Sequence, residues 1–164
     1  MPDGLSVTKA GESDIPLILR FIKDLAVYER MPDECVATEE KLRSTLFGQN
    51  PAAEVLVARL DGNPVGFALF FHSYSTFLAQ RGIYLEDLFV DPSARGKGIG
   101  FRLLSELARL AVERGCGRLE WAVLNWNDLA IDFYKRIGAT ALDEWTTFRL
   151  AGESLHSLAR ESSA

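Results

Sequence analysis

The chain has 164 residues, a length that suits one domain with a substantial hydrophobic core. Hydrophobic residues make up 48% and charged residues 25% of the sequence, which excludes an intrinsically disordered protein. The net charge of -5 argues against a nucleic-acid-binding surface and favours a cationic partner.

The apolar runs are shorter than the roughly 20 residues that a membrane span requires, and the first residues lack the pattern of a signal peptide. We therefore expect no membrane association and a cytoplasmic location. Cys35 and Cys116 are isolated in the sequence, so they indicate neither a disulfide framework nor a zinc site, and no metal is expected. His72 and His156 also lack partners at ligand spacing and receive no predicted role.

The spacing of apolar residues predicts strands interspersed with helices. In chain order the predicted elements are a strand at 5–10, helices at 11–30 and 39–48, strands at 53–60, 65–74 and 83–90, a helix at 99–114, a strand at 118–124, a helix at 129–137, a strand at 145–150 and a short helix at 153–161. Ser13 or Asp14 is the expected N-cap of the first helix, and Thr38 that of the second.

This order predicts an α/β fold with one mixed sheet, helices on its faces and a single domain over residues 1–164. Residues 61–64, with the sequence DGNP, form a turn that joins two antiparallel strands. The helix that begins at Ile99 is then a right-handed crossover between two parallel strands.

The segment Arg95–Phe101, RGKGIGF, enters that helix with three glycines at alternate positions. Free amides at the start of a helix, the helix dipole and bare backbone together make a site for a phosphate or pyrophosphate. Arg95 and Lys97 can add positive charge to it. The alternative is a flexible turn with a glycine-rich cap, and the spacing matches neither a P-loop nor a dinucleotide-binding fingerprint.

The spacing of Arg95, Gly98 and Gly100 resembles the Arg-x-x-Gly-x-Gly signature with which the GNAT superfamily of N-acetyltransferases binds pyrophosphate. Residues 84–100 and 124–139 resemble the hallmark segments of its diamine (spermidine/spermine) acetyltransferase branch, and residues 21–30 resemble a third. The resemblance covers nearly the whole chain. It implies a mostly antiparallel sheet with a splayed parallel pair of strands where the cofactor enters.

The resemblance implies that acetyl-CoA lies along the strand before the loop and places its pyrophosphate on the loop. The cofactor-binding residues expected on this basis are Leu88, Phe89, Val90, Arg95, Gly96, Lys97, Gly98, Ile99, Gly100, Phe101, Asn127 and Tyr134. For Asn127, a role as the cap of the following helix is the simpler alternative to a contact with the pantetheine arm.

Acetyl transfer to an amine requires a neutral amine and a proton for the departing thiolate. By resemblance Tyr134 gives that proton, while the alternative is a tyrosine in a helix core. Glu86 contacts the amine and acts as its base, directly or through water, and the alternative is a salt bridge at the rim of the site. In a regular strand Asp87 points to the face opposite Glu86, so it is structural or a second substrate contact.

Tyr28 and Glu29 match the substrate-binding pair of the diamine enzymes, with Asp33 and Glu34 close behind. Carboxylates pair with ammonium groups and aromatic rings cover methylene stems, although a solvated helix end is the alternative. The chain departs from the branch at Phe77, where the diamine enzymes carry a tryptophan, and relatives in this branch prefer lysine-like substrates such as thialysine.

The resemblance therefore implies a cytoplasmic, homodimeric enzyme that acetylates a primary amine of a small cationic substrate, such as a diamine, a polyamine or a lysine analogue. In the dimer the second subunit can complete the substrate site. Two alternatives remain at this point: an acetyltransferase that acts on a protein lysine or N-terminus, and a module that binds acyl-CoA without turnover.

Overall fold

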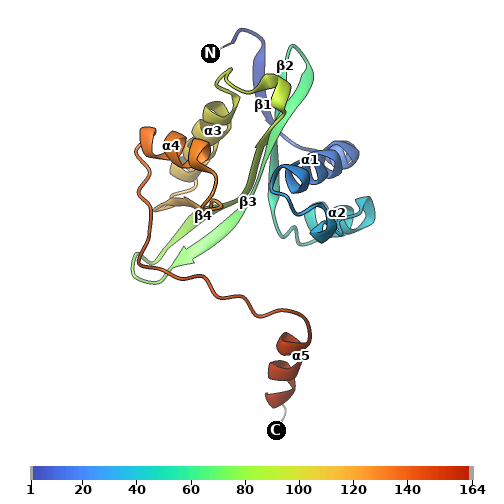
Figure 1. Ribbon diagram of the computed structural model, residues 1–164, viewed down its shortest axis with the longest axis vertical. Coiled ribbons are helices and arrows are strands. Elements are labelled where there is room, and N and C mark those ends of the chain that lie inside the picture. Colours follow the sequence, from blue (N-terminus) through green and yellow to red (C-terminus); the bar gives the residue numbers. More distant parts are fainter. Residues whose placement is uncertain (1, 163–164) are drawn as a thin grey trace. The chain divides into compact units, whose positions relative to one another are not determined.

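The computed structural model describes residues 2–162, which fall into two compact units (Figure 1). Among the described residues, the first unit spans residues 2–122 and the second spans residues 123–162. The β-sheet and the helices that cover it belong to the first unit, and two further helices belong to the second. Among residues 2–162, no helix is both long and apolar enough to cross a membrane.

Five strands form one sheet in the order β1-β2-β3-β4-β5. They are β1 (Leu5–Lys9), β2 (Glu54–Leu60), β3 (Asn63–Ser75), β4 (Gln80–Val90) and β5 (Leu119–Trp121). Strands β1 to β4 pair antiparallel, whereas β5 runs parallel to β4. The predicted α/β fold with one mixed sheet is confirmed.

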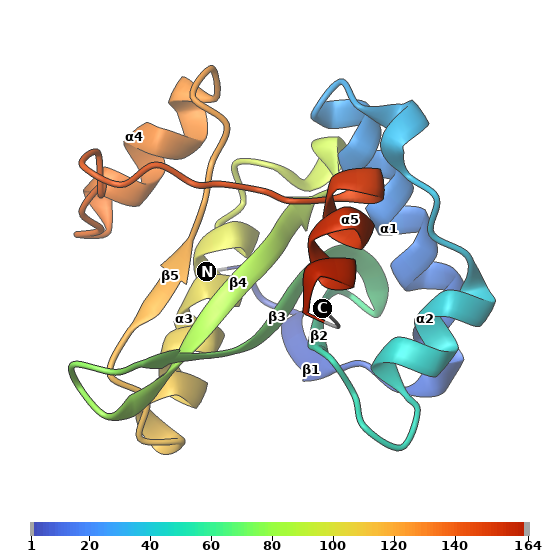
Figure 2. The same ribbon diagram turned by 90° about the horizontal axis from the view of Figure 1, so that it is seen from below.

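Helices cover both faces of the sheet, as Figure 2 shows, with α1 and α2 on one side and α3 on the other. Their bounds are α1 (Ile15–Tyr28), α2 (Glu39–Leu46) and α3 (Ile99–Glu113). Each helix turns an apolar stripe inward, and the buried residues are Ile15, Ile18, Phe21 and Leu25 in α1 and Ile99, Leu103, Leu104, Leu107 and Ala111 in α3. The side chain of Thr38 caps α2 as expected, accepting a hydrogen bond of 3.2 Å from the Lys41 amide.

The N-cap of α1 is Asp14, one of the two expected residues. Its carboxylate accepts hydrogen bonds from the Gly11 amide and the Arg59 guanidinium, at 2.9 and 2.7 Å, and not from the amides of α1. The cap residue therefore ties the start of α1 to β2.

A β-bulge interrupts β4 at Glu86. The register pairs Leu85 with Phe70 and Asp87 with Leu69, so Glu86 is an extra residue without a cross-strand partner. Such a bulge bends its strand and shifts the alternation of side chains by one residue.

The bulge turns the second half of β4 toward α1. Phe89 pairs with Phe67, and their ring centres lie 6.1 and 5.4 Å from that of Phe21 in α1. Since residues two apart in a strand share a face, Asp87 also lies on this α1 face. The strand is therefore not regular at Glu86 and Asp87, because the bulge inserts a residue between the two halves of β4.

Strand β5 is shorter than the strand predicted at 118–124. It pairs with β4 over Ile83–Leu85, and this pairing ends where the bulge begins. In the part of the chain that the structure describes, residues 86–90 of β4 have no parallel strand beside them. The two parallel strands thus separate next to the bulge and leave that edge of β4 open.

The second unit contains α4 (Asp128–Arg136) and α5 (Gly152–Glu161), which confirm two predicted helices. Residues 145–150 between them form no strand, so the predicted closing strand is wrong. These residues are rich in aromatic and β-branched side chains, which favour strands, but a strand also needs a neighbour that pairs with its backbone amides and carbonyls. Within residues 2–162 this segment has no such neighbour.

Candidate active site

Three carboxylates, Glu29, Glu86 and Asp87, form an acidic cluster where the end of α1 meets the bulge in β4. Glu29 ends α1, and its amide donates a hydrogen bond of 2.8 Å to the Leu25 carbonyl. Burial raises the pKa of Glu29, and the charge of Glu86 adds to the effect. Burial also raises the pKa of Asp87 to about 6, with further contributions from Glu86 and Glu29. The structure thus brings together three of the predicted site residues.

The acidic cluster lacks internal neutralisation. Among the described residues, no lysine or arginine forms an ion pair with Glu29, Glu86 or Asp87, and the neighbouring charges that raise the pKa values of Glu29 and Asp87 are all acidic. The pKa of Tyr84 is raised as well, first by burial and then by Glu86. A bound cation relieves both the repulsion and the desolvation of such carboxylates. The cluster is therefore suited to an ammonium group.

Tyr28 lies beside the acidic cluster and contacts the loop that follows β4. Its ring centre is 4.4 Å from the guanidinium carbon of Arg95. The Arg95 Nε donates a hydrogen bond of 3.0 Å to the Val90 carbonyl. Its guanidinium carbon also lies 5.7 Å from the ring centre of Phe89. The structure therefore connects the expected substrate residue Tyr28 with the expected cofactor loop.

Glycine is required in the loop because the backbone takes a left-handed conformation twice. Gly96 has φ 77° and Gly98 has φ 78°, and Gly98 is the N-cap of α3. A Cβ atom at either position would meet nothing within 4 Å. Glycine is therefore required at these positions by the left-handed backbone and not by crowding within the first unit. The space beside both residues is open to a ligand.

The start of α3 offers free donors to a ligand. The Arg102 amide donates to the Gly98 carbonyl at 3.0 Å, and the three amides before it precede the first hydrogen-bonded turn of the helix. Lys97 is exposed beside them, whereas the Ile99 side chain is buried and anchors the helix. The amides and the helix dipole favour an anion at this point.

The loop packs directly onto the strand that the sequence assigned to the cofactor. A Cβ atom on Gly100 would lie 3.8 Å from a methyl group of Leu88 and 3.9 Å from one of Val90, both ordinary contacts. Phe101, the last residue of the predicted loop, keeps 47% of its surface exposed. Strand β4 and the start of α3 thus form one continuous surface beside the open edge of β4.

The second unit carries the remaining predicted residues. Asn127 is the N-cap of α4, where its side-chain oxygen accepts a hydrogen bond of 3.3 Å from the Ala130 amide. Its predicted capping role is confirmed. Tyr134 lies in α4, is half-buried and has its ring centre 5.5 Å from that of Phe133. Gly138, with φ 89°, follows the helix in the left-handed conformation that commonly ends helices.

Residues 24–139 match the family described as "Acetyltransferase (GNAT) family", a span that includes the bulge, the glycine loop and α4. The chain belongs to this family. It is an N-acetyltransferase, and the resemblance noted in the sequence is confirmed.

The acetyltransferase has relatives of similar length. It is 42% identical to a thialysine N-epsilon-acetyltransferase of Sus scrofa, over 93% of this chain and 96% of the relative. It is 34% identical to an L-ornithine N5-acetyltransferase of Arabidopsis thaliana, over 91% of this chain and 85% of the relative. Among solved structures, an integron cassette protein from the mobile metagenome of V. cholerae superimposes with a TM-score of 0.82 at 29% identity, covering 97% of this chain and 99% of that one.

A second carboxylate site in the acetyltransferase, at Glu54, differs from the acidic cluster because basic side chains neutralise its charge. Glu54, at the start of β2, accepts hydrogen bonds of 2.6 and 3.1 Å from Arg114 and pairs with Lys9 at 2.9 Å. Hydrogen bonds from Arg114, and to a smaller extent from Lys9, lower the pKa of Glu54 to about 2 although burial opposes the shift. The network joins β1, β2 and the end of α3 through a neutralised carboxylate.

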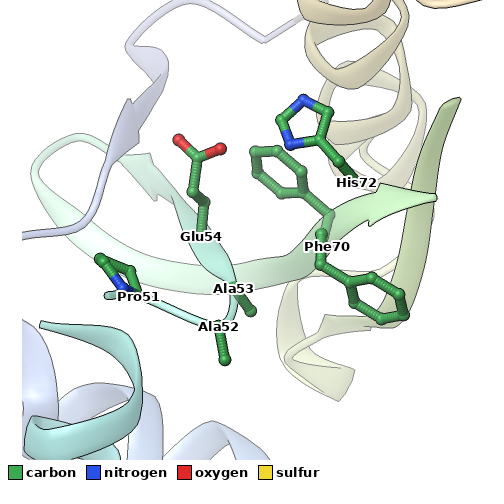
Figure 3. A pocket seen from close by; sticks show the side chains of 7 residues that line it. Pro51, Ala52, Ala53, Glu54, Phe70 and His72 are labelled. Atoms are coloured by element: carbon green, nitrogen blue, oxygen red, sulfur yellow. The ribbon is translucent and has the colours of Figure 1, made fainter. Parts of the chain in front are cut away.

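A pocket of about 260 Å³ beside this network lies apart from the acidic cluster (Figure 3). Its lining residues are Pro51, Ala52, Ala53, Glu54, Phe70, Phe71 and His72. Burial and the charge of Arg114 lower the pKa of His72, so this histidine is neutral near pH 7. The neutral histidine and the paired carboxylate make this a structural region of the enzyme.

Sequence reasoning missed two features of these sites. It missed the bulge, which depends on how β3 and β4 register and leaves no local pattern in the sequence. It also missed the pairing of Glu54 with Arg114, two residues that are 60 positions apart in the chain. One available signal was a carboxylate at the start of an otherwise apolar strand, since such a residue needs a partner when it becomes buried.

Proposed function

We propose that this enzyme transfers an acetyl group from acetyl-CoA to a primary amine of a small cationic substrate, a diamine, a polyamine or a lysine analogue. The observation that carries the proposal is the acidic cluster without basic partners, which lies next to the glycine loop of an acetyltransferase. Thialysine and ornithine, the substrates named for two relatives, each carry a side-chain amine that such a cluster can bind. These relatives favour a lysine analogue over a polyamine.

We further propose that the loop Arg95–Phe101 holds the pyrophosphate of acetyl-CoA and that Leu88, Phe89 and Val90 line the acyl arm. Support comes from the open space at Gly96 and Gly98, where a phosphate can approach the backbone. Lys97 supplies a positive charge next to the free amides of α3. Asn127, which caps α4, then contributes through that helix, and both units belong to the single catalytic domain predicted for residues 1–164.

In the proposed reaction, acetyl-CoA supplies the acetyl group as a thioester. Glu86 or Asp87, directly or through water, removes a proton from the substrate ammonium. The neutral amine nitrogen forms a bond to the acetyl carbon, and the bond from that carbon to sulfur breaks. Tyr134 gives a proton to the thiolate, and the acetylated nitrogen loses its second proton, which returns to the Tyr134 oxygen through water. The products are an N-acetylated amine and coenzyme A, and the proton taken from the ammonium leaves the carboxylate for solvent. A carboxyl with a pKa of about 6, as at Asp87, suits a base that works near neutral pH.

Tyr28 and Glu29 complete the proposed amine site. Glu29 adds a third carboxylate, and the Tyr28 ring offers a flat surface for the methylene stem of the substrate. Asp33 and Glu34 follow in a short turn and are exposed, so their contribution is limited to the field around the site.

The test is an amine screen with the purified enzyme and acetyl-CoA. Thialysine, ornithine, lysine, putrescine, spermidine and lysine-containing or free N-terminal peptides are compared by thiol release, and mass spectrometry locates the acetylated nitrogen. We expect turnover with at least one small amine and a much slower rate with peptides. Faster acetylation of peptides than of every small amine contradicts the proposed substrate class. Thiol release from no substrate contradicts the proposed activity.

A Tyr134→Phe variant tests the proposed acid in the same assay. If the phenol protonates the thiolate, kcat falls by about 10- to 100-fold while the affinity for coenzyme A, measured by calorimetry, stays within about twofold. An unchanged kcat removes Tyr134 from the mechanism.

We also propose that the enzyme is a homodimer, and that the second copy covers apolar residues in the second unit. Trp145 is 76% exposed and Phe148 is 92% exposed, in a segment without a strand partner among residues 2–162. Light scattering should give twice the monomer mass, and Phe148→Ser should reduce it toward that of one chain. A wild-type enzyme that stays monomeric at high concentration contradicts this part of the proposal. The cytoplasmic location stays a prediction.

A further inference from the structure

Two arginines connect α1 with the segment that follows β4. One belongs to α1 and the other to that segment. Arg20 of α1 reaches Asp91, with 3.9 Å between the guanidinium nitrogen and the carboxylate oxygen. Arg95, four residues after Asp91, reaches back to Tyr28 at the other end of α1. The beginning of the cofactor loop is therefore fastened to the helix that carries Tyr28 and Glu29.

The Arg95 side chain is fixed at two points. Its Nε donates to the Val90 carbonyl at 3.0 Å, which anchors the guanidinium to the end of β4. Its guanidinium carbon lies 4.4 Å from the centre of the Tyr28 ring. A guanidinium over an aromatic ring is held by the charge of the cation and by the stacking of two flat groups, which an ammonium group reproduces in part.

This arrangement differs from that of Lys97 in the same loop. Lys97 is exposed and, within residues 2–162, forms no ion pair with the acidic cluster, so its charge is available to a ligand in front of α3. The charge of Arg95 lies instead over Tyr28, next to the residue pair proposed to bind the amine. The two cations of the loop are thus suited to different tasks.

We propose that Arg95 is a positioning residue for the amine site: its guanidinium, anchored on the Val90 carbonyl, holds the Tyr28 ring and the adjacent Glu29 against the bulge of β4. The inference rests on the proposed function of this site. It adds that the loop proposed to bind the cofactor also sets the geometry of the amine site, through one side chain.

The experiment separates the positioning role from a simple phosphate contact. Arg95→Lys keeps the positive charge but loses the flat stacked group, whereas Lys97→Met removes the charge of the exposed neighbour. Because Arg95 belongs to the loop proposed to hold the pyrophosphate, Arg95→Lys is expected to change the coenzyme A dissociation constant by a smaller factor than it raises the amine KM, which should rise by about fivefold or more. Lys97→Met should do the reverse. Arg109→Lys, on the exposed side of α3 where Arg109 pairs with Glu106 and Glu113, is the matched control and should change neither constant.

A double-mutant cycle with Tyr28→Leu completes the test. Because both residues act through one contact, the double variant Arg95→Lys/Tyr28→Leu should have an amine KM no higher than about twice that of the worse single variant. Multiplicative effects in the cycle, or a wild-type amine KM in Arg95→Lys, overturn the proposal. A fall in Tm that is accompanied by equal changes in both constants also overturns it, since that result indicates general destabilisation.

Failure of the proposed function gives a different result. A wild-type enzyme that acetylates none of the amines contradicts the function, not the contact. The same cycle is then measured by urea denaturation of the free protein, where additive effects of the two substitutions on the unfolding midpoint overturn the role of Arg95 in holding Tyr28.

Discussion

The acetyltransferase contains two carboxylate sites that have opposite electrostatic environments. Glu54 lies between Arg114 and Lys9, which lower its pKa to about 2. Asp87 lies near Glu29 and Glu86 without a basic partner, and its pKa rises to about 6. A carboxylate that is already paired stabilises the fold, whereas one that is left unpaired destabilises it and is suited to bind a cation. The comparison separates a structural site from a functional one.

The strongest test of this comparison is Asp87→Asn. Loss of a group that binds the amine and shares in its deprotonation should lower kcat/KM by about 100-fold. The Tm should stay equal or rise, because the substitution removes a desolvated and repelled charge. Steady-state kinetics and calorimetry give both values, with Asp61→Asn in the exposed turn between β2 and β3 as the control. A lower Tm for Asp87→Asn would assign it a structural role.

The reverse pattern is expected for Glu54→Gln. Arg114 and Lys9 lose their charged acceptor, so the free energy of unfolding should fall by about 1–2 kcal/mol, with a fall in Tm of about 2–8 °C. The kcat/KM for the amine should remain within about twofold of the wild type. Thermal denaturation and the same kinetic assay check both statements. A large loss of activity at unchanged Tm would show that the two carboxylate sites are not separate in function.

Ionisation of the two carboxylates changes the free energy of unfolding in opposite directions: as the pH rises, Glu54 stabilises the fold and Asp87 destabilises it. The folded-state pKa of Glu54 is lowered from 4.5 to about 2, so its stabilisation is complete above pH 4.5 and is lost as the pH falls toward 2. The folded-state pKa of Asp87 is raised from 3.8 to about 6, so its destabilisation develops as the pH rises from 3.8 to 6. Urea denaturation between pH 3 and 7 should show a higher stability of Asp87→Asn relative to wild type at pH 7, and a smaller difference at pH 3. An equal difference at both pH values contradicts the assignment.

A smaller effect is expected from Glu86→Gln on the pH dependence of the reaction. The negative charge of Glu86 helps to raise the pKa of Asp87, so its removal should lower that pKa. If Asp87 shares in the deprotonation, the acidic limb of the kcat/KM profile then moves to lower pH. A Glu86→Gln variant with reduced kcat/KM and an unmoved acidic limb would show that the group behind this limb does not sense the charge of Glu86, which contradicts the proposed role of Asp87.

The features that were predictable from sequence are those with a local cause. The glycines at 96 and 98 are adjacent to a helical pattern, and both are needed for left-handed backbone. The capping residues Thr38 and Asn127 act on amides three positions away, so they too can be found locally. The features that were not predictable depend on distant partners. The segment at 145–150 has the aromatic and β-branched residues that favour a strand, but it has no neighbouring strand among the described residues.

The same reasoning applies to the carboxylates. The acidic residues at positions 29, 86 and 87 indicated a cation-binding site from sequence alone. The sequence did not show that their charges lie close enough to shift the pKa values of Glu29 and Asp87. That outcome depends on one unpaired residue in β4, and the pattern of β4 alone gives no sign of it. The ion pair of Glu54 with Arg114 likewise depends on the packing of α3 on the sheet.

Glu86, the extra residue in β4, shifts the alternation of side chains between the two faces of the sheet by one position. Leu85 pairs with Phe70 before it, whereas Phe89 meets Phe21 of α1 after it, although both positions are odd-numbered. If β4 instead kept a regular register, with Glu86 opposite Leu69, residues 87–90 would turn to the opposite faces of the sheet. Asp87 would then exchange its environment with Leu88, and the chain would enter the glycine turn rotated by half a pleat. The register of β4 therefore determines which of its side chains face the active site, and the bulge sets that register.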